Sequence, residues 1–117
     1  MITGGYNGKY LSRAEILDLH TGNWKTVKDL LTPRSWHCAV KLNGKVYGLG
    51  GQNNVNGYLN NVESFDIEKN EWYQESSLNE SRDRFGAVTY DNRFFCTWWL
   101  QSKWKIKNGS IMGFKNW

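Results

Sequence analysis

The fold is decided by two stretches of this sequence, Tyr10–Val40 (YLSRAEILDLHTGNWKTVKDLLTPRSWHCAV) and Tyr58–Val88 (YLNNVESFDIEKNEWYQESSLNESRDRFGAV), which repeat one another 48 residues apart. When Tyr10–Tyr47 is aligned with Tyr58–Phe95, nine of 38 positions are identical, and they fall on residue types that end strands and fill cores. Self-similarity at a period near 50 residues indicates a repeat architecture, in which one repeat cannot bury its apolar face without neighbours.

One period of the repeat predicts four short strands. They cover residues 37–42, 45–49, 62–67 and 71–75. The first two are joined by Asn43-Gly44, a strong signal for a two-residue hairpin turn. In the third, the apolar residues Val62, Phe65 and Ile67 do not alternate cleanly, so we expect a bulge or burial on both faces. No window shows helical apolar spacing over 11 or more residues, and the sequence therefore predicts an all-β fold.

Glycine pairs and tryptophans mark the repeat. Gly4-Gly5 and Gly50-Gly51 follow the second strand of their repeats, where the chain must turn or approach another backbone closely. Trp24 and Trp72 begin the fourth strand, and we expect both to lie in the core. Two carboxylate pairs, Glu15/Asp18 and Glu63/Asp66, resemble general acid/base devices, but their recurrence with the repeat favours a structural role.

This ordered set of landmarks resembles the kelch repeat, from Met1 to about Phe95. The landmarks are Arg34, Asn43-Gly44, Tyr47, Gly50-Gly51, Glu63, Phe65-Asp66 and Trp72. In that family each repeat forms one blade of a β-propeller, and closed propellers have about 4–8 blades. The resemblance implies a partial kelch-type β-propeller that is a fragment of a larger protein. It would comprise a partial blade (1–33), a complete four-stranded blade (34–81), a truncated blade (82–99) and an off-pattern basic tail (100–117) that we expect to be disordered.

The third repeat departs from the pattern near its end. A glycine pair is due within residues 96–99, but the sequence there is Cys96-Thr97-Trp98-Trp99. Because tryptophan has the single codon TGG, Trp98-Trp99-Leu100 reads in the next frame as Gly-Gly. We therefore hypothesise a change of reading frame near Cys96, with a diverged last strand as the alternative. Sequencing the transcript decides between them.

Charge and composition limit the classes of partner. Residues 1–99 hold eleven Lys and Arg against eleven Asp and Glu, so the net charge of +4 comes from the tail. We therefore expect no nucleic-acid binding. The sequence has no apolar run of 18 residues and no signal-peptide pattern, and we expect no membrane partner. Cys38 and Cys96 are too few for a disulfide framework, and we expect reduced thiols and a cytoplasmic location.

The sequence gives little support for catalysis. His20 and His37 lie in different repeats without recurrent metal-ligand spacing around them, and no nucleophile motif frames a serine. We predict no catalytic residue, no metal site and no cofactor. Some kelch-type propellers are secreted copper oxidases, which makes an enzyme the remote alternative, but the copper ligands of those enzymes match no position here.

Partner-binding residues follow from the resemblance. In kelch-type propellers, contacts come from residues just after the glycine pair and from the turn that enters the first strand. The matching positions are Tyr6, Gln52, Asn54, Trp36 and Arg84. Tyr, Trp and Arg dominate contact energies at interfaces, and Asn and Gln supply adaptable hydrogen bonds. For Trp36, packing between blades is the alternative interpretation.

The tight 48-residue spacing most resembles the kelch-like proteins. Those join a BTB dimerisation domain to the propeller and present substrates to cullin-RING ubiquitin ligases. The resemblance implies a protein-interaction module that binds a protein or peptide substrate on its loop face. Cullin would bind only through a BTB domain, which this sequence does not contain. The alternative is a cytoskeletal kelch protein whose propeller binds actin.

Overall fold

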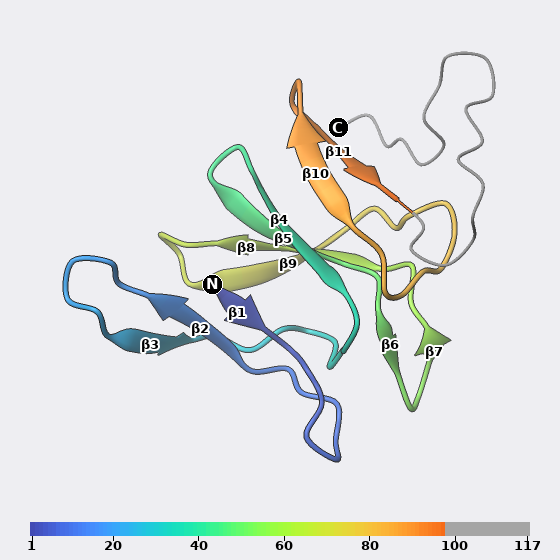
Figure 1. Ribbon diagram of the computed structural model, residues 1–117, viewed down its shortest axis with the longest axis horizontal. Coiled ribbons are helices and arrows are strands. Elements are labelled where there is room, and N and C mark those ends of the chain that lie inside the picture. The colour runs from blue at the N-terminus through green and yellow to red at the C-terminus, as the bar shows by residue number, and fades with distance from the viewer. Residues whose placement is uncertain (98–117) are drawn as a thin grey trace.

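The computed structural model describes residues 1–97, which form β-strands and connecting loops and, within that range, no helix (Figure 1). The all-β prediction is therefore confirmed. The strands are β1 (Ile2–Thr3), β2 (Ala14–Leu17), β3 (Trp24–Val27), β4 (Cys38–Leu42), β5 (Lys45–Leu49), β6 (Gln52–Asn53), β7 (Gly57–Tyr58), β8 (Val62–Asp66), β9 (Glu71–Glu75), β10 (Ala87–Tyr90) and β11 (Arg93–Cys96).

The central sheet has the order β4-β5-β8-β9, with every neighbouring pair antiparallel. Asn43 and Gly44 join β4 to β5 with φ values of 49° and 76°, the positive values that a type I′ hairpin requires. In β8 the pairing runs without interruption from Val62 to Phe65 on one side and to Asp66 on the other. Residues 62–65 are all buried, so the irregular apolar pattern reflects burial on both faces rather than a bulge.

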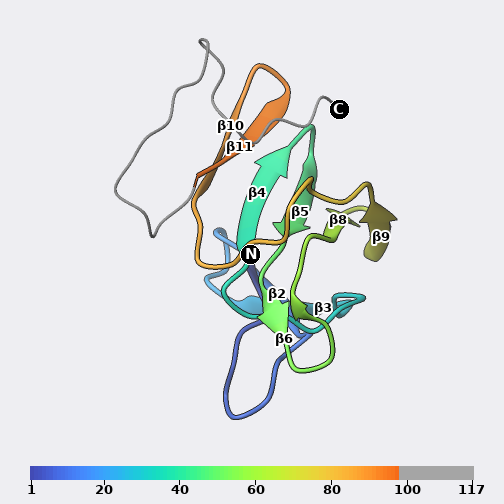
Figure 2. The ribbon, with the colours of Figure 1, turned by 90° about the vertical axis from the view of Figure 1, so that its right-hand side faces the viewer.

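A smaller sheet flanks the central one on each side. The sheet β1-β2-β3 and the pair β10-β11 lie at opposite ends of the described chain, with the central sheet between them (Figures 1 and 2). We call these sheets the first blade (β1–β3), the second blade (β4, β5, β8, β9) and the third blade (β10, β11). One apolar core lies between the first and second blades and includes Ala14, Leu30, Phe65 and Trp72. Another lies between the second and third blades, where Phe85, Phe94 and Cys96 join residues of the central sheet.

Each glycine pair connects its blade to the next one. Gly5 donates its N–H to the Arg34 carbonyl at 2.8 Å, and Gly51 donates in the same way to the Arg82 carbonyl at 2.8 Å. Gly50 and Gly51 have φ values of 57° and 93°, in the left-handed region that favours glycine. A β-carbon on Gly51 would lie only 2.5 Å from the Ser35 carbonyl oxygen. The predicted close backbone approach is therefore confirmed.

Replacing Gly51 with valine is expected to lower the free energy of unfolding by ~1–3 kcal/mol, because the new side chain combines an unfavourable φ with a backbone clash. Gly8→Val is the matched control, since Gly8 has a similar φ of 98° but nothing within 4 Å of its missing β-carbon. Urea unfolding of both variants and of the unmodified chain measures these free energies of unfolding. Equal stability of Gly51→Val and the unmodified chain would contradict the close approach.

The two tryptophans differ in burial. Trp72 is 4% exposed, which confirms its predicted place in the core, whereas Trp24 is 49% exposed, and the prediction that it lies in the core is wrong. The difference follows from the neighbours. The Trp72 indole lies against the first blade and donates to the Lys28 carbonyl at 2.7 Å. Trp24 belongs to the first blade itself, and the described residues include no blade on its corresponding side.

The third blade keeps the repeat register as far as it is described. Ala87 pairs with Cys96, and Thr97 donates its N–H to the Gly86 carbonyl at 2.8 Å. The proposed glycine-pair site at Trp98-Trp99 and the tail 100–117 lie outside the described residues. The frame-change hypothesis and the expected disorder of the tail remain predictions.

Candidate partner-binding face

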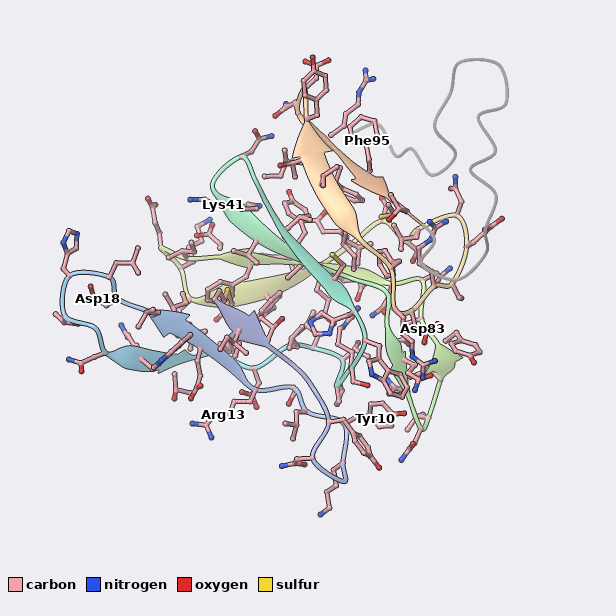
Figure 3. The ribbon with its side chains drawn as sticks, viewed as in Figure 1. Tyr10, Arg13, Asp18, Lys41, Asp83 and Phe95 are labelled. Atoms are coloured by element: carbon pink, nitrogen blue, oxygen red, sulfur yellow. The ribbon has the colours of Figure 1, made fainter. Side chains whose placement is uncertain are left out.

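One end of the molecule gathers the loops that carry the predicted binding residues. The segment after the second glycine pair lies beside the turn that enters β4, because Ser35 and Gln52 exchange backbone hydrogen bonds of 3.1 and 3.0 Å. The same end holds the β6–β7 ribbon, which replaces part of the polar loop expected there. Figure 3 shows Tyr10 and Asp83 near this ribbon, whereas Asp18 and Lys41 lie away from it.

Two tyrosines and a glutamine form the first part of this face. Tyr6 is 59% exposed, and its ring centroid lies 5.1 Å from that of Tyr10. Gln52 donates its amide N–H to the Tyr10 hydroxyl at 3.0 Å, which links the first blade to the second. Tyr10 is the first residue of the repeated stretch, but it was not among the predicted binding residues. Its position four residues after Tyr6 is the sequence feature that could have indicated a place on this face.

Trp36 and Arg84 form the second part, and they occupy the same position in successive repeats. Their φ values are 51° and 48°, which are unusual for residues other than glycine. Arg84 donates its backbone N–H to the Trp36 carbonyl at 2.8 Å, and its guanidinium carbon lies 3.9 Å from the Trp36 ring centroid. The indole is still 45% exposed. Trp36 therefore contacts the next blade and remains accessible, and its partner-binding role stays a prediction.

The ends of the face are polar. Asn54 is exposed in the turn between β6 and β7, and the described contacts do not link it to the other four predicted residues. Tyr58, the repeat equivalent of Tyr10, is 65% exposed. It lines an open depression of about 310 Å³ together with Thr32, Asn56, Leu59, Asn60 and Asn61. Four of the five predicted residues are thus connected through contacts, and Tyr10 and Tyr58 extend the surface.

A buried ion pair supports these loops from beneath. The Arg34 guanidinium donates to the Glu63 carboxylate at 2.6 Å, and both side chains are 0% exposed. Glu63 also accepts the backbone N–H groups of Leu31 and Thr32 at 2.8 and 2.9 Å, and Arg34 donates to the Gly50 carbonyl at 2.7 Å. Burial lowers the pKa of Arg34, and the adjacent Glu63 opposes that shift. The pair therefore fixes the linker between the first and second blades to the second glycine pair.

The recurrent carboxylates have structural contacts. Asp66 accepts the backbone N–H groups of Glu68 and Lys69, and Asp18 accepts those of His20 and Thr21, as expected for turn-forming residues. The backbone hydrogen bonds lower the pKa of Asp18. Asp18, Asp66 and the ion-paired Glu63 therefore have the structural role that the repetition of the pairs indicates, whereas Glu15 pairs with Arg13 at the surface.

The described residues offer few groups with reactive chemistry. Within residues 1–97, no three His, Cys, Asp or Glu side chains gather as metal ligands. Cys38 and Cys96 are free thiols, and burial raises the pKa of Cys96 to about 11, which keeps it protonated near neutral pH. The described part of the chain contains no helix with the length and apolar character to cross a membrane.

Comparison with known proteins identifies the repeat. The sequence matches the Kelch motif family over residues 1–31 and 33–79, more than half of the chain. The chain belongs to the Kelch motif family. It is 31% identical to alpha-scruin of Limulus polyphemus over 97 residues (76% of this chain, 11% of that protein). It is 38% identical to Kelch-like protein 7 of Rattus norvegicus over 72 residues (62% of this chain, 12% of that protein).

Further matches agree with this fold. The chain is 31% identical to Kelch-like ECH-associated protein 1A of Danio rerio over 99 residues, which is 80% of this chain and 16% of that protein. The solved structure of YjhT superimposes with a TM-score of 0.64 at 15% identity, over 81% of this chain and 32% of that chain. The kelch chain is therefore a partial β-propeller with one complete blade, and it spans only about 11–16% of these curated relatives. Kelch repeats indicate a protein-interaction module.

Proposed function

We propose that this kelch chain is part of the substrate-recognition propeller of a kelch-like adaptor for a cullin-RING ubiquitin ligase in the cytoplasm, and that it acts by binding rather than by catalysis. The observation that carries the proposal is the accessible face built from Tyr6, Tyr10, Trp36 and Arg84, which contains the residue types that supply most binding energy at protein interfaces. The matches to two kelch-like proteins support the adaptor assignment.

The partner would be a protein or peptide with acidic or phosphorylated groups. Arg84 presents a guanidinium whose side chain is 49% exposed, and its position over the Trp36 ring orders it before a ligand arrives. Asp83, whose side chain is 20% exposed, lies 3.5 Å from the Arg84 guanidinium, so an incoming carboxylate or phosphate would compete with a long, partly exposed ion pair. Cullin would bind through a BTB domain elsewhere in the protein.

An actin-binding kelch protein is the second candidate. Alpha-scruin, whose name does not place it among the kelch-like proteins, matches a larger share of the chain than Kelch-like protein 7 does. The gene sequence upstream of Met1 distinguishes the two candidates. A BTB-encoding segment there supports the adaptor, and an upstream region without one supports the actin-binding alternative.

Replacing Arg84 with alanine is expected to weaken binding of an acidic or phosphorylated peptide by about 10–100-fold, because hydrogen bonds to charged groups contribute about 1.5–3 kcal/mol. Thermal stability should stay nearly unchanged, since the side chain is half exposed and loses its stack on Trp36 and a weak ion pair with Asp83. Isothermal titration calorimetry and thermal melts measure both. Arg84→Lys, which keeps the charge without the planar fork, should show an intermediate loss. If Arg84→Ala lost as much stability as affinity, Arg84 would have a structural role instead.

A further inference from the structure

His37 lies under three of the segments that form the candidate face. It directly follows Trp36 in the chain, and it contacts both glycine pairs that lead to Tyr6 and Gln52. A β-carbon on Gly4 would lie 2.9 Å from the ring atom Cε1 of His37, and one on Gly51 would lie 2.8 Å from the His37 β-carbon. The side chain is therefore wedged in the junction between the first and second blades.

The repeat places a different residue at the equivalent position in the next junction. Phe85 lies 48 residues after His37, and a β-carbon on Gly50 would lie 3.2 Å from its ring atom Cε1. The two rings thus fill the same site against successive glycine pairs. The second junction is closed by an apolar ring, and the first is closed by one that can bind a proton.

The surroundings of His37 suit the neutral ring and not the protonated one. Its Nε2 shares a hydrogen bond of 2.8 Å with the Thr3 hydroxyl, while Nδ1 is buried without a hydrogen-bond partner among the described residues. A protonated ring would carry an N–H at both nitrogens, so one donor would be left unsatisfied. Arg34 is the charged group that acts on the pKa of the ring, and it is itself paired with Glu63. Thr3 and Gly51 also contact the side chain, and both are uncharged.

We propose that His37 makes the junction between the first and second blades acid-sensitive, so that acidification loosens the Gly4-Gly5 segment that leads to Tyr6, which the His37 ring itself contacts, whereas Gly51 faces the His37 β-carbon. The acid sensitivity of the junction stands whether or not this face binds a partner. Only its consequence, a loss of partner affinity in acid, rests on the proposed function.

The direction of the effect follows from the two protonation equilibria. Burial and then the charge of Arg34 lower the pKa of His37 from 6.5 to about 4 in the folded chain. Between about pH 4 and pH 6.5, His37 therefore binds a proton more readily when the junction is open than when it is closed. Closure is fully stable above pH 6.5, weakens as the pH falls below it, and stops weakening below about pH 4. From pH 7.5 to pH 5 the closing equilibrium constant should fall by roughly 30-fold.

Hydrogen exchange of two backbone amides in the whole chain tests the proposal. Gly5 and Gly51 donate equivalent hydrogen bonds to Arg34 and Arg82, and each follows a glycine, so their intrinsic exchange chemistry is matched. We expect protection of Gly5 to fall relative to that of Gly51 by up to roughly 30-fold between pH 7.5 and pH 5. The variant His37→Phe, which copies the second junction, should remove the difference. The variant His20→Gln, which removes the exposed histidine of the β2–β3 turn, should keep it.

The outcomes are distinct. If both amides follow the same pH dependence in the unmodified chain, or if His37→Phe retains the difference, the proposal is overturned. Should His37→Phe fail to fold, NMR titration of the His37 ring in the unmodified chain decides the question. A midpoint well below 6 supports the acid-sensitive junction, and a midpoint near the ordinary value of 6.5 overturns it.

Discussion

Glu63→Gln is expected to destabilise the chain by about 3–5 kcal/mol, the cost typical of removing one partner from a buried ion pair. The substitution leaves the Arg34 guanidinium buried at 0% exposure without a counter-charge. It also places an amide group where two carboxylate oxygens now accept the N–H groups of Leu31, Thr32 and Arg34. The NH₂ group of the new amide would face one of these N–H donors, and this adds to the loss of stability. Chemical denaturation at neutral pH measures the change.

The repeat supplies a matched control for this substitution. Glu15 is the equivalent residue of the first blade, but it accepts from Arg13 in a pair whose arginine side chain is 65% exposed. Glu15→Gln should therefore change stability by no more than about 0.5 kcal/mol. Equal effects of Glu63→Gln and Glu15→Gln would show that the buried pair contributes nothing specific.

Much of the fold was predictable because its signals are local and occur twice. The hairpin at Asn43-Gly44 and the close approach at Gly50-Gly51 both depend on backbone conformations that few residue types adopt. The repeat landmarks then placed the strands of the second blade to within one residue at each end. The exposed side chains of Tyr6, Trp36 and Arg84 lie on loops at one end of the sheets, where the resemblance to kelch repeats placed them.

Several long-range contacts, within the second blade and between blades, were not predictable, because they join residues that lie far apart in the sequence. The sequence marked Arg34 and Glu63 as separate landmarks, and only the structure shows that they pair across 29 positions. The same holds for Tyr10, whose hydroxyl meets Gln52 of the next blade. Burial of a repeat position also depends on whether a neighbouring blade covers it, and no local pattern carries that information. Trp24 shows this limit most clearly.

Trp72→Ala is expected to lower the free energy of unfolding by about 3–5 kcal/mol, since it removes a large buried side chain and leaves a cavity. The indole is 4% exposed, its ring lies 5.0 Å from the Phe65 ring, and its N–H donates to the Lys28 carbonyl. The variant therefore loses apolar burial, an aromatic contact and a hydrogen bond between two blades at once. Urea unfolding followed by circular dichroism measures the loss.

Trp24→Ala is the control, because it removes the same residue type from the same repeat position in a different blade. Trp24 occupies the same place in its repeat, but it is 49% exposed and belongs to the first blade. Its removal should cost less than about 1 kcal/mol, because a half-exposed side chain leaves no closed cavity. A loss at Trp24 as large as that at Trp72 would mean that the fourth-strand tryptophan stabilises its own blade. The expected difference of several kcal/mol instead assigns the stabilisation to the contact between blades, as repeat architectures require.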